Sequence, residues 1–300
     1  MKKLGLIAVA ILLTGCGTSQ ESQSQTISEN DVSTISINSP TTFSVSRVVV
    51  LANGVAEIMN SLNARSILIG RDISSTEEAL ADIPVVTSGH QVLSEQVIAL
   101  KPDLVIVDAS TGPKSAIDQI KAAGINVVQT PESWTLADIS SKVAAVASAI
   151  GARQQGELLN RAIAAEIQTS TLPSKPRIAF LYLRGTSSIY LMGGPGSGAD
   201  SLISAIGAVD VGAQSLEYPF NTMTAEALAT LNPNVIIVMT KGLQSVGGLP
   251  GLLKLPGVAQ TQAGKSGAII DVNDSLLLSF GPRTPSLVTS LAESVRALTQ

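Results

Sequence analysis

The sequence predicts an α/β protein of two lobes, with mainly parallel sheets joined by a long bridging helix. Short runs of Val, Ile and Leu alternate with helical stretches in residues 47–132 and again in residues 173–300, a pattern typical of parallel sheets. A helix, a break at proline and a buried strand form residues 94–107 and recur in residues 224–238. An Ala-rich helical pattern, residues 136–169, separates the two halves. These observations favour two lobes of related build and an interlobe helix within residues 133–172.

The elements of the N-terminal lobe are predicted from apolar runs and from the residues that bound them. Short apolar runs indicate buried strands, and Gly, Pro or a first-turn carboxylate marks the ends of helices. Ser94 is expected to cap its helix, with Glu95 in the first turn. The expected order is strand 47–51, helix 54–62, strand 66–70, strand 84–86, helix 94–100, strand 104–107, helix 113–123 and strand 126–129.

The remaining elements follow by the same reasoning. Gly151 and Gly156 weaken the middle of the Ala-rich segment, so a break or kink there stays open. After two prolines the α/β pattern restarts, and the C-terminal lobe is expected to contain strand 177–183, helix 201–206, helix 224–231 and strand 235–238.

The first residues of the chain predict export. Lys2 and Lys3 precede an apolar stretch, residues 4–13, that is too short to span a bilayer. Residues 13–16, Leu-Thr-Gly-Cys, end in the only cysteine and resemble the bacterial lipoprotein cleavage signal. We therefore expect residues 1–16 to be a signal peptide with a lipidated Cys16, which anchors the protein to the outer face of the cytoplasmic membrane. An ordinary signal peptide with an incidental cysteine is the alternative.

Composition limits the possible functions. Residues 17–46 are rich in Ser, Thr, Gln and Asn, which predicts a flexible tether. The net charge of −4 gives no reason to expect nucleic-acid binding. One histidine and one cysteine leave little for a catalytic triad or a histidine-rich metal site. We expect a monomeric binding protein rather than an enzyme.

Several blocks of sequence resemble one family. They are the paired helix–Pro–strand segments and residues 193–198, 242–248, 255–257 and 276–285. They are similar to substrate-binding proteins of bacterial ABC importers for iron chelates and cobalamin, particularly hemin-binding members. The resemblance covers nearly all of the chain after Ser46. It implies heme (hemin) as the transported ligand in iron acquisition, held between the lobes and delivered to a permease dimer with its ATPase.

The resemblance also implies roles for individual residues. Many hemin-binding members carry a tyrosine where this chain has Ser88, and serine cannot replace phenolate as an iron ligand. His90 and Tyr218, in loops expected to face each other across the cleft, are the predicted axial ligands. Arg283 is the first candidate for a propionate partner. The other cleft candidates are Arg71, Arg184, Ser74 and Ser88, and core packing is expected for Tyr182 and Tyr190.

Glu95 and Glu226 are expected to dock on the permease, one from each lobe. Within the same family, a siderophore or cobalamin ligand is the main alternative to heme. A heme relay protein that does not dock on a permease is another.

Overall fold

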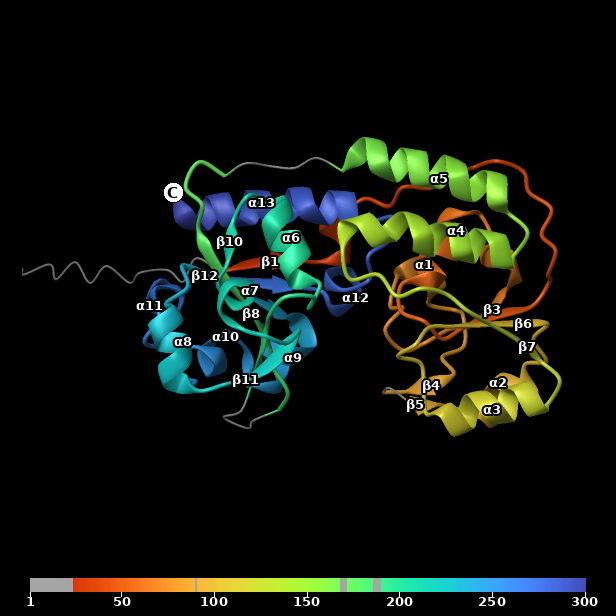
Figure 1. Cartoon of the computed structure of the whole chain (residues 1–300), viewed down its shortest axis with the longest axis horizontal. Helices are drawn as coiled ribbons and strands as arrows, with labels where there is room; N and C mark the ends of the chain where they lie inside the picture. The colour runs from red at the N-terminus through yellow and green to blue at the C-terminus, as the bar shows by residue number, and fades with distance from the viewer. Residues whose placement is uncertain (1–23, 90, 168–171, 186–189) are drawn as a thin grey trace, which may run out of the picture.

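Two lobes, each built on its own sheet, make up the protein (Figure 1). The computed structural model describes residues 24–89, 91–167, 172–185 and 190–300, so the expectations for the signal peptide, Cys16 and His90 lie outside it. The predicted fold class of two α/β lobes with mainly parallel sheets is confirmed.

The N-terminal lobe contains a four-stranded parallel sheet in the order β3-β2-β6-β7. Side chains alternate along β2: Val48 and Val50 face a core that contains α1 and α4, whereas Val49 faces α2 and α3. Both faces of the sheet are thus covered by helices, which explains its uninterrupted apolar strands. The elements are β2 Val48–Val50, α1 Val55–Ser61, β3 Leu68–Gly70, the hairpin β4 Thr87–Ser88 and β5 Gln91–Val92, α2 Ser94–Ala99, β6 Leu104–Val107, α3 Lys114–Ala122 and β7 Asn126–Gln129, with short 3-10 helices at Arg65–Ile67 and Glu78–Leu80.

The C-terminal lobe has a larger mixed sheet in the order β1-β13-β12-β8-β9-β11, with β10 also paired to β8. Strands β9 and β11 are antiparallel to their neighbours and form one edge. The elements are β8 Arg177–Tyr182, β9 Tyr190–Gly193, α6 Ala199–Ala205, β10 Val209–Asp210, α7 Val211–Ser215, β11 Phe220–Met223, α8 Ala225–Leu231, β12 Val235–Met239, α9 Thr240–Ser245, α10 Gly248–Leu252, α11 Gln262–Ser266, β13 Ile269–Val272, α12 Asp274–Leu277 and α13 Thr284–Thr299.

The repeated unit predicted from the sequence has matching backbone geometry in the two lobes. Helix α2 leads to β6 and helix α8 leads to β12. Each connection contains a non-glycine residue with positive φ, Lys101 at 49° and Asn232 at 44°. One detail was wrong: Leu93 occupies the N-cap of α2, and Ser94 is the first helical residue, with its hydroxyl bonded to Gln119. Thr224 does cap α8, since its hydroxyl accepts a hydrogen bond from Ala227 N.

The segment between the lobes is a pair of helices rather than one long helix. Helix α4 covers Ile139–Ala149 and α5 covers Arg153–Glu166, after the short 3-10 helix Leu136–Asp138. The chain reverses at Gly151, which has a φ of 81°. An added Cβ at Gly156 would lie 2.5 Å from Cβ of Ala147, so glycine lets the two helices approach. Figure 1 shows α4 and α5 side by side above the N-terminal lobe.

The tether expected for residues 17–46 was wrong from residue 24 onward. Strand β1, Gln25–Ile27, pairs in parallel with β13 at the edge of the C-terminal sheet. The chain continues through the 3-10 helix Glu29–Asp31 and across the molecule, where Ile37 N donates to Ser61 O and Ser44 N to Ile150 O. The scattered apolar residues of this polar stretch, among them Ile27, pack on the main core. They provide the burial that its composition appeared to lack.

Candidate functional site

A cavity of about 510 Å³ lies between the two lobes. Its volume is in the range of small-molecule and cofactor sites. The N-terminal lobe lines it with polar side chains and the C-terminal lobe with mainly apolar ones. A second depression, of about 630 Å³, lies beside Lys175, Asn234 and Lys265 at the opposite, amino-terminal edge of the C-terminal sheet, and no aromatic residue lines it. The interlobe cavity is therefore the candidate site.

The polar wall comes from the carboxyl ends of the parallel strands of the N-terminal lobe. Asn53 follows β2, Ser74 follows β3 and Ser110 follows β6, and all three line the cavity. Such strand ends are where open α/β sheets usually bind ligands. The loops are held by carboxylates: the Ser110 hydroxyl donates to Asp108 at 2.8 Å, and Ser74 N donates to Asp72 at 2.9 Å. These hydrogen bonds within the loops hold Ser74 and Ser110 in the wall of the cavity.

The apolar wall comes from strands β8, β9, β11 and β12. Tyr182, Leu191, Phe220 and Met239 line the cavity from these strands. The rings of Tyr182 and Phe220 pack edge to face, with centroids 5.7 Å apart and planes inclined by 64°. Trp134, at the N-terminal side, adds a further aromatic surface, and its Nε1 donates to Glu132 at 3.2 Å. A flat aromatic ligand suits this combination of surfaces.

Tyr182 brings a polar atom into the apolar wall. Arg184 Nη2 donates a hydrogen bond of 2.7 Å to its phenol oxygen. The guanidinium carbon also lies 4.9 Å from the centre of the tyrosine ring. A phenol oxygen beside a cation is suited to carry negative charge, and a phenolate is one of the axial ligands that iron porphyrins use.

Lys142 is a buried cation in the cavity wall. It extends from α4, and its Nζ donates to Ser279 O of the C-terminal lobe at 2.8 Å. Burial, partly offset by the charges of Glu57 and Asp108, lowers the pKa of this ammonium to about 8. Lys142 is therefore still mainly protonated at neutral pH.

Of the predicted cleft residues, the structure brings Ser74 and Arg184 to the cavity. Tyr218 is 65% exposed and is absent from the lining residues, so this geometry does not support its predicted ligand role. Tyr182, expected in the core, lines the cavity instead. Tyr190 is buried, and its hydroxyl donates to Pro256 O at 2.9 Å. Ser88 is exposed in β4 of the short hairpin.

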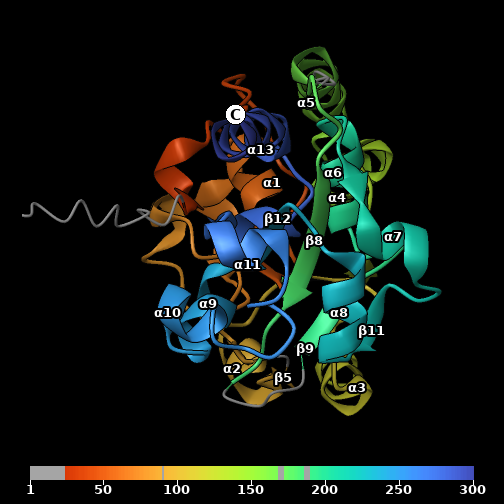
Figure 2. The same ribbon diagram turned by 90° about the vertical axis from the view of Figure 1, so that its left-hand side faces the viewer.

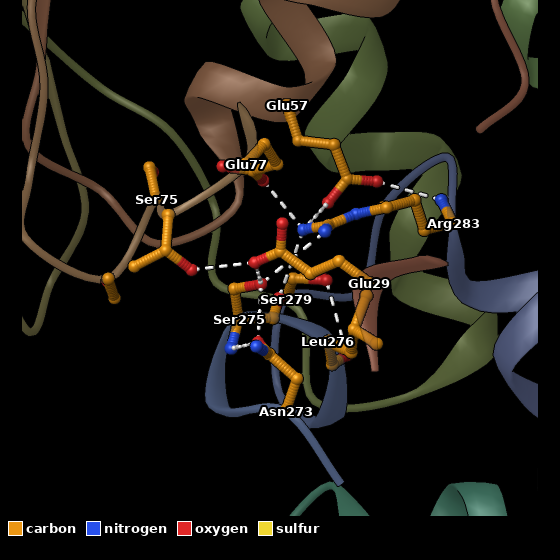
Figure 3. Close-up of polar contacts among 12 residues, drawn as sticks. Glu29, Glu57, Ser75, Glu77, Asn273, Ser275, Leu276, Ser279 and Arg283 are labelled. Atoms are coloured by element: carbon orange, nitrogen blue, oxygen red, sulfur yellow. Dashed lines mark hydrogen bonds and ion pairs between the residues drawn. The ribbon is translucent and has the colours of Figure 1, made fainter. Parts of the chain in front are cut away.

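Arg283 is not among the residues that line the cavity, so this geometry does not support its predicted role as a propionate partner. Its side chain is only 4% exposed and forms ion pairs with Glu57 at 3.0 Å and with Glu77 at 2.6 Å (Figure 3). It also contacts the backbone oxygen of Ser275 at 3.2 Å. This cluster joins α1 and a loop of the N-terminal lobe to the start of α13, and it engages both terminal nitrogens of the guanidinium within the protein.

Arg71 is also committed to structure. Its guanidinium donates to Leu80 O at 3.0 Å and to Ser75 O at 2.6 Å, and the residue is buried. It fixes the loop that carries Ser74. Glu95 and Glu226 are exposed in the first turns of α2 and α8, as their predicted docking role requires, but nothing in the fold tests that role.

Lys142, Ser133 and Phe220 are among the cavity residues that the sequence did not predict. Phe220 lies only two residues after Tyr218. The sequence therefore indicates the right segment of the C-terminal lobe, but the residue that lines the cavity is Phe220 rather than Tyr218. Lys142 lies in the segment that the sequence predicts only as an interlobe helix. The pattern of Ala and charged residues in this segment does not indicate that Lys142 is buried. Tyr182 could have been found, because it ends a strand whose carboxyl end faces the cleft.

Two absences apply only to the described part of the chain. No group of three or more His, Cys, Asp or Glu residues with the geometry of a metal site occurs there. In the same residues, no helix combines the length and apolar character needed to cross a bilayer.

Two α/β lobes with a lined cavity between them define a binding protein that holds its ligand between the lobes. The chain belongs to the periplasmic binding protein family, whose sequence pattern matches residues 48–276. It is similar to the periplasmic heme-binding protein RhuT from Roseiflexus sp. RS-1, at 33% identity and a TM-score of 0.81, over 85% of this chain and 100% of that chain.

Two further relatives extend the comparison. The heme-binding protein HmuT is 33% identical with a TM-score of 0.78, over 92% of this chain and 95% of that chain. An uncharacterized ABC transporter substrate-binding lipoprotein, YvrC of Bacillus subtilis, is 24% identical over 97% of this chain and 95% of its own length.

Proposed function

We propose that this protein is the extracytoplasmic substrate-binding component of an ABC importer and that its ligand is heme. The observation that carries the proposal is the pairing of Tyr182 with Arg184 at the end of an apolar wall, inside the interlobe cavity. A porphyrin needs a broad apolar surface, an axial ligand for its iron and polar groups for its propionates. Phe220, Leu191 and Trp134 supply the first, and Tyr182 the second.

The relatives support this ligand. Structures similar to this chain over most of its length are described as heme-binding proteins, including BhuT in complex with two hemes, at 29% identity and a TM-score of 0.75. The relative from Bacillus subtilis is described as a substrate-binding lipoprotein of an ABC transporter. The protein acts in this proposal as a carrier rather than an enzyme.

Tyr182 serves as one axial ligand of the iron, and Arg184 stabilises the negative charge on its oxygen. His90 remains a proposed second ligand; in the sequence it comes two residues after Ser88 and directly before Gln91. In this proposal the signal peptide directs export, and the lipid on Cys16 anchors the protein at the outer face of the cytoplasmic membrane. The protein acts there as a monomer.

A hemin titration tests the proposal. The protein, expressed without residues 1–16, is titrated with hemin while the Soret band is recorded, and in parallel with cyanocobalamin and a ferric siderophore. Heme as the ligand requires saturable, stoichiometric Soret changes at micromolar hemin. Absence of a Soret change, or tighter binding of cobalamin or siderophore, contradicts the heme assignment and favours the corresponding alternative.

A further inference from the structure

Lys142 and Ser133 are buried polar side chains of the cavity wall whose hydrogen-bond donors are incompletely used in the described part of the chain. Their residues are 3% and 6% exposed, and both line the cavity. Lys142 comes from α4, whereas Ser133 lies just after β7. They thus approach the cavity from two different elements.

The ammonium group of Lys142 has N–H groups that make no hydrogen bond to the described residues. An ammonium group has three N–H bonds, and among the described residues Nζ makes one hydrogen bond, to Ser279 O. The carboxylates near it in the described part of the chain raise its pKa but form no ion pair with it within 4 Å. They are engaged elsewhere: Glu57 pairs with Arg283, and Glu132 accepts from Trp134. A buried cation in this state is best satisfied by an anion that enters the cavity.

Ser133 points to the same conclusion independently. Its hydroxyl is buried and has no hydrogen-bond partner among the residues that the structure describes. Buried hydroxyls in native proteins are almost always hydrogen-bonded, so an orphan in a cavity wall indicates a group that arrives with the ligand. A hydroxyl donor and an ammonium donor together suit the two oxygens of a carboxylate.

We propose that Lys142 and Ser133 form a carboxylate-binding site in the cavity wall. If heme is the ligand, as proposed above, this site binds one of its two propionates. Lys142 is anchored at the same time to Ser279 of the C-terminal lobe, and an added Cβ on Gly54 of the N-terminal lobe would lie 3.0 Å from Nζ. The carboxylate is therefore recognised where the two lobes and α4 meet, and this sets the orientation of the porphyrin in the cavity.

The experiment compares hemin with hemin dimethyl ester, in which both propionates are esterified. Affinities of both compounds are measured by Soret titration for the wild type, K142M and S133A. K121M is the matched control, because Lys121 is an exposed lysine on α3. Circular dichroism and thermal unfolding establish that each variant is folded.

The wild type is expected to bind hemin at least about tenfold more tightly than the ester, as one charge-assisted hydrogen bond would give. K142M should lose about tenfold in hemin affinity but little in affinity for the ester. S133A should show the same pattern with a loss of about threefold in hemin affinity. K121M should match the wild type for both compounds. Equal losses for hemin and ester in K142M, or no preference in the wild type, overturn the site while leaving heme binding intact. If K142M does not fold, S133A decides by the same criterion. If the wild type binds neither compound, the proposed heme-binding function is wrong, and the proposed propionate site is then wrong as well.

Discussion

Arg184 and Tyr182 are joined in two ways, by a hydrogen bond of 2.7 Å from Nη2 to the phenol oxygen and by the guanidinium carbon at 4.9 Å from the ring centre. Together the two contacts hold a positive charge beside the phenol oxygen of a residue that lines the cavity. The pair therefore presents an oxygen atom with a cation beside it, which is the arrangement that the proposed heme binding would use.

Replacing Tyr182 with Phe should remove the iron ligand while keeping the ring that packs on Phe220. We expect hemin affinity to fall by about tenfold or more, equivalent to ~1.4 kcal/mol or more, and the ferric–phenolate charge-transfer absorption to disappear. R184M should weaken the same absorption. Tyr218→Phe is the matched control and should behave as the wild type. The opposite result, with Tyr218 essential and Tyr182 dispensable, would show that the exposed loop supplies the ligand.

The buried ion pair between Glu57 and Arg283 should matter for stability rather than for binding. Removing one partner leaves an uncompensated buried charge, so R283M should lower the free energy of unfolding by ~3–5 kcal/mol. Urea denaturation measures the difference. D118N, which breaks the exposed Lys114–Asp118 pair, is the control and should change stability by less than ~0.5 kcal/mol. A loss in R283M as small as that in D118N would show that Arg283 is not buried with its partners.

Glu77 should make stability depend on pH near neutrality. Burial raises the pKa of this carboxyl to about 7, and the negative charges of Glu57 and Glu29 add to the effect, although Arg283 opposes it. The folded state therefore holds a proton on Glu77 between about pH 4.5 and 7 that the unfolded state has released. Stability is thus expected to fall as the pH rises through this range.

The variant E77Q, which mimics the protonated form, isolates this effect. Urea denaturation at pH 5, 6, 7 and 8 should show E77Q close to the wild type at pH 5 and more stable than it at pH 8. Taking the difference removes the contribution of Asp210, whose pKa burial raises to about 6. Parallel pH profiles for the two proteins would contradict the predicted protonation of Glu77.

The sequence allowed the strands and the paired lobes to be predicted because burial on both faces of a parallel sheet leaves uninterrupted runs such as residues 104–107 and 235–238. The sequence does not decide whether the helix breaks at Gly151, and the reason is physical. A glycine in an Ala-rich helix only weakens it, and only the tertiary contact of Gly156 with Ala147 shows that two helices pack together.

The candidate site was harder to predict because its residues meet through tertiary structure. Arg283 was chosen for its chemistry, which suits carboxylates, but the carboxylates that it binds are Glu57 and Glu77 of the protein itself. Both lie more than 200 residues away along the chain. No local pattern distinguishes such a partner from a ligand. The same applies to Lys142, whose burial depends on both lobes.

Ile27 should contribute to stability although it lies in a segment of polar composition. It is buried on β1 against the main core, opposite Val272 of β13. Ile27→Ala should cost ~2–4 kcal/mol of unfolding free energy. Thr26→Ala, at the exposed neighbouring position of the same strand, is the control and should stay within ~0.5 kcal/mol of the wild type. Equal, small effects in urea denaturation would mean that β1 is not held in the sheet.

Glu95 and Glu226 should be needed for delivery but not for binding. Figures 1 and 2 both show α2 and α8, the helices that carry these two residues, on the half of the molecule away from α5 and α13. Charge reversal, E95R with E226R, places like charges against a basic docking surface and should abolish hemin uptake in the organism that makes the protein. Hemin affinity of the purified variant should equal that of the wild type, because neither residue lines the cavity. E293R, which reverses an exposed charge on α13, should leave uptake intact. Normal uptake with both docking residues reversed would instead favour a relay that passes heme to a second binding protein.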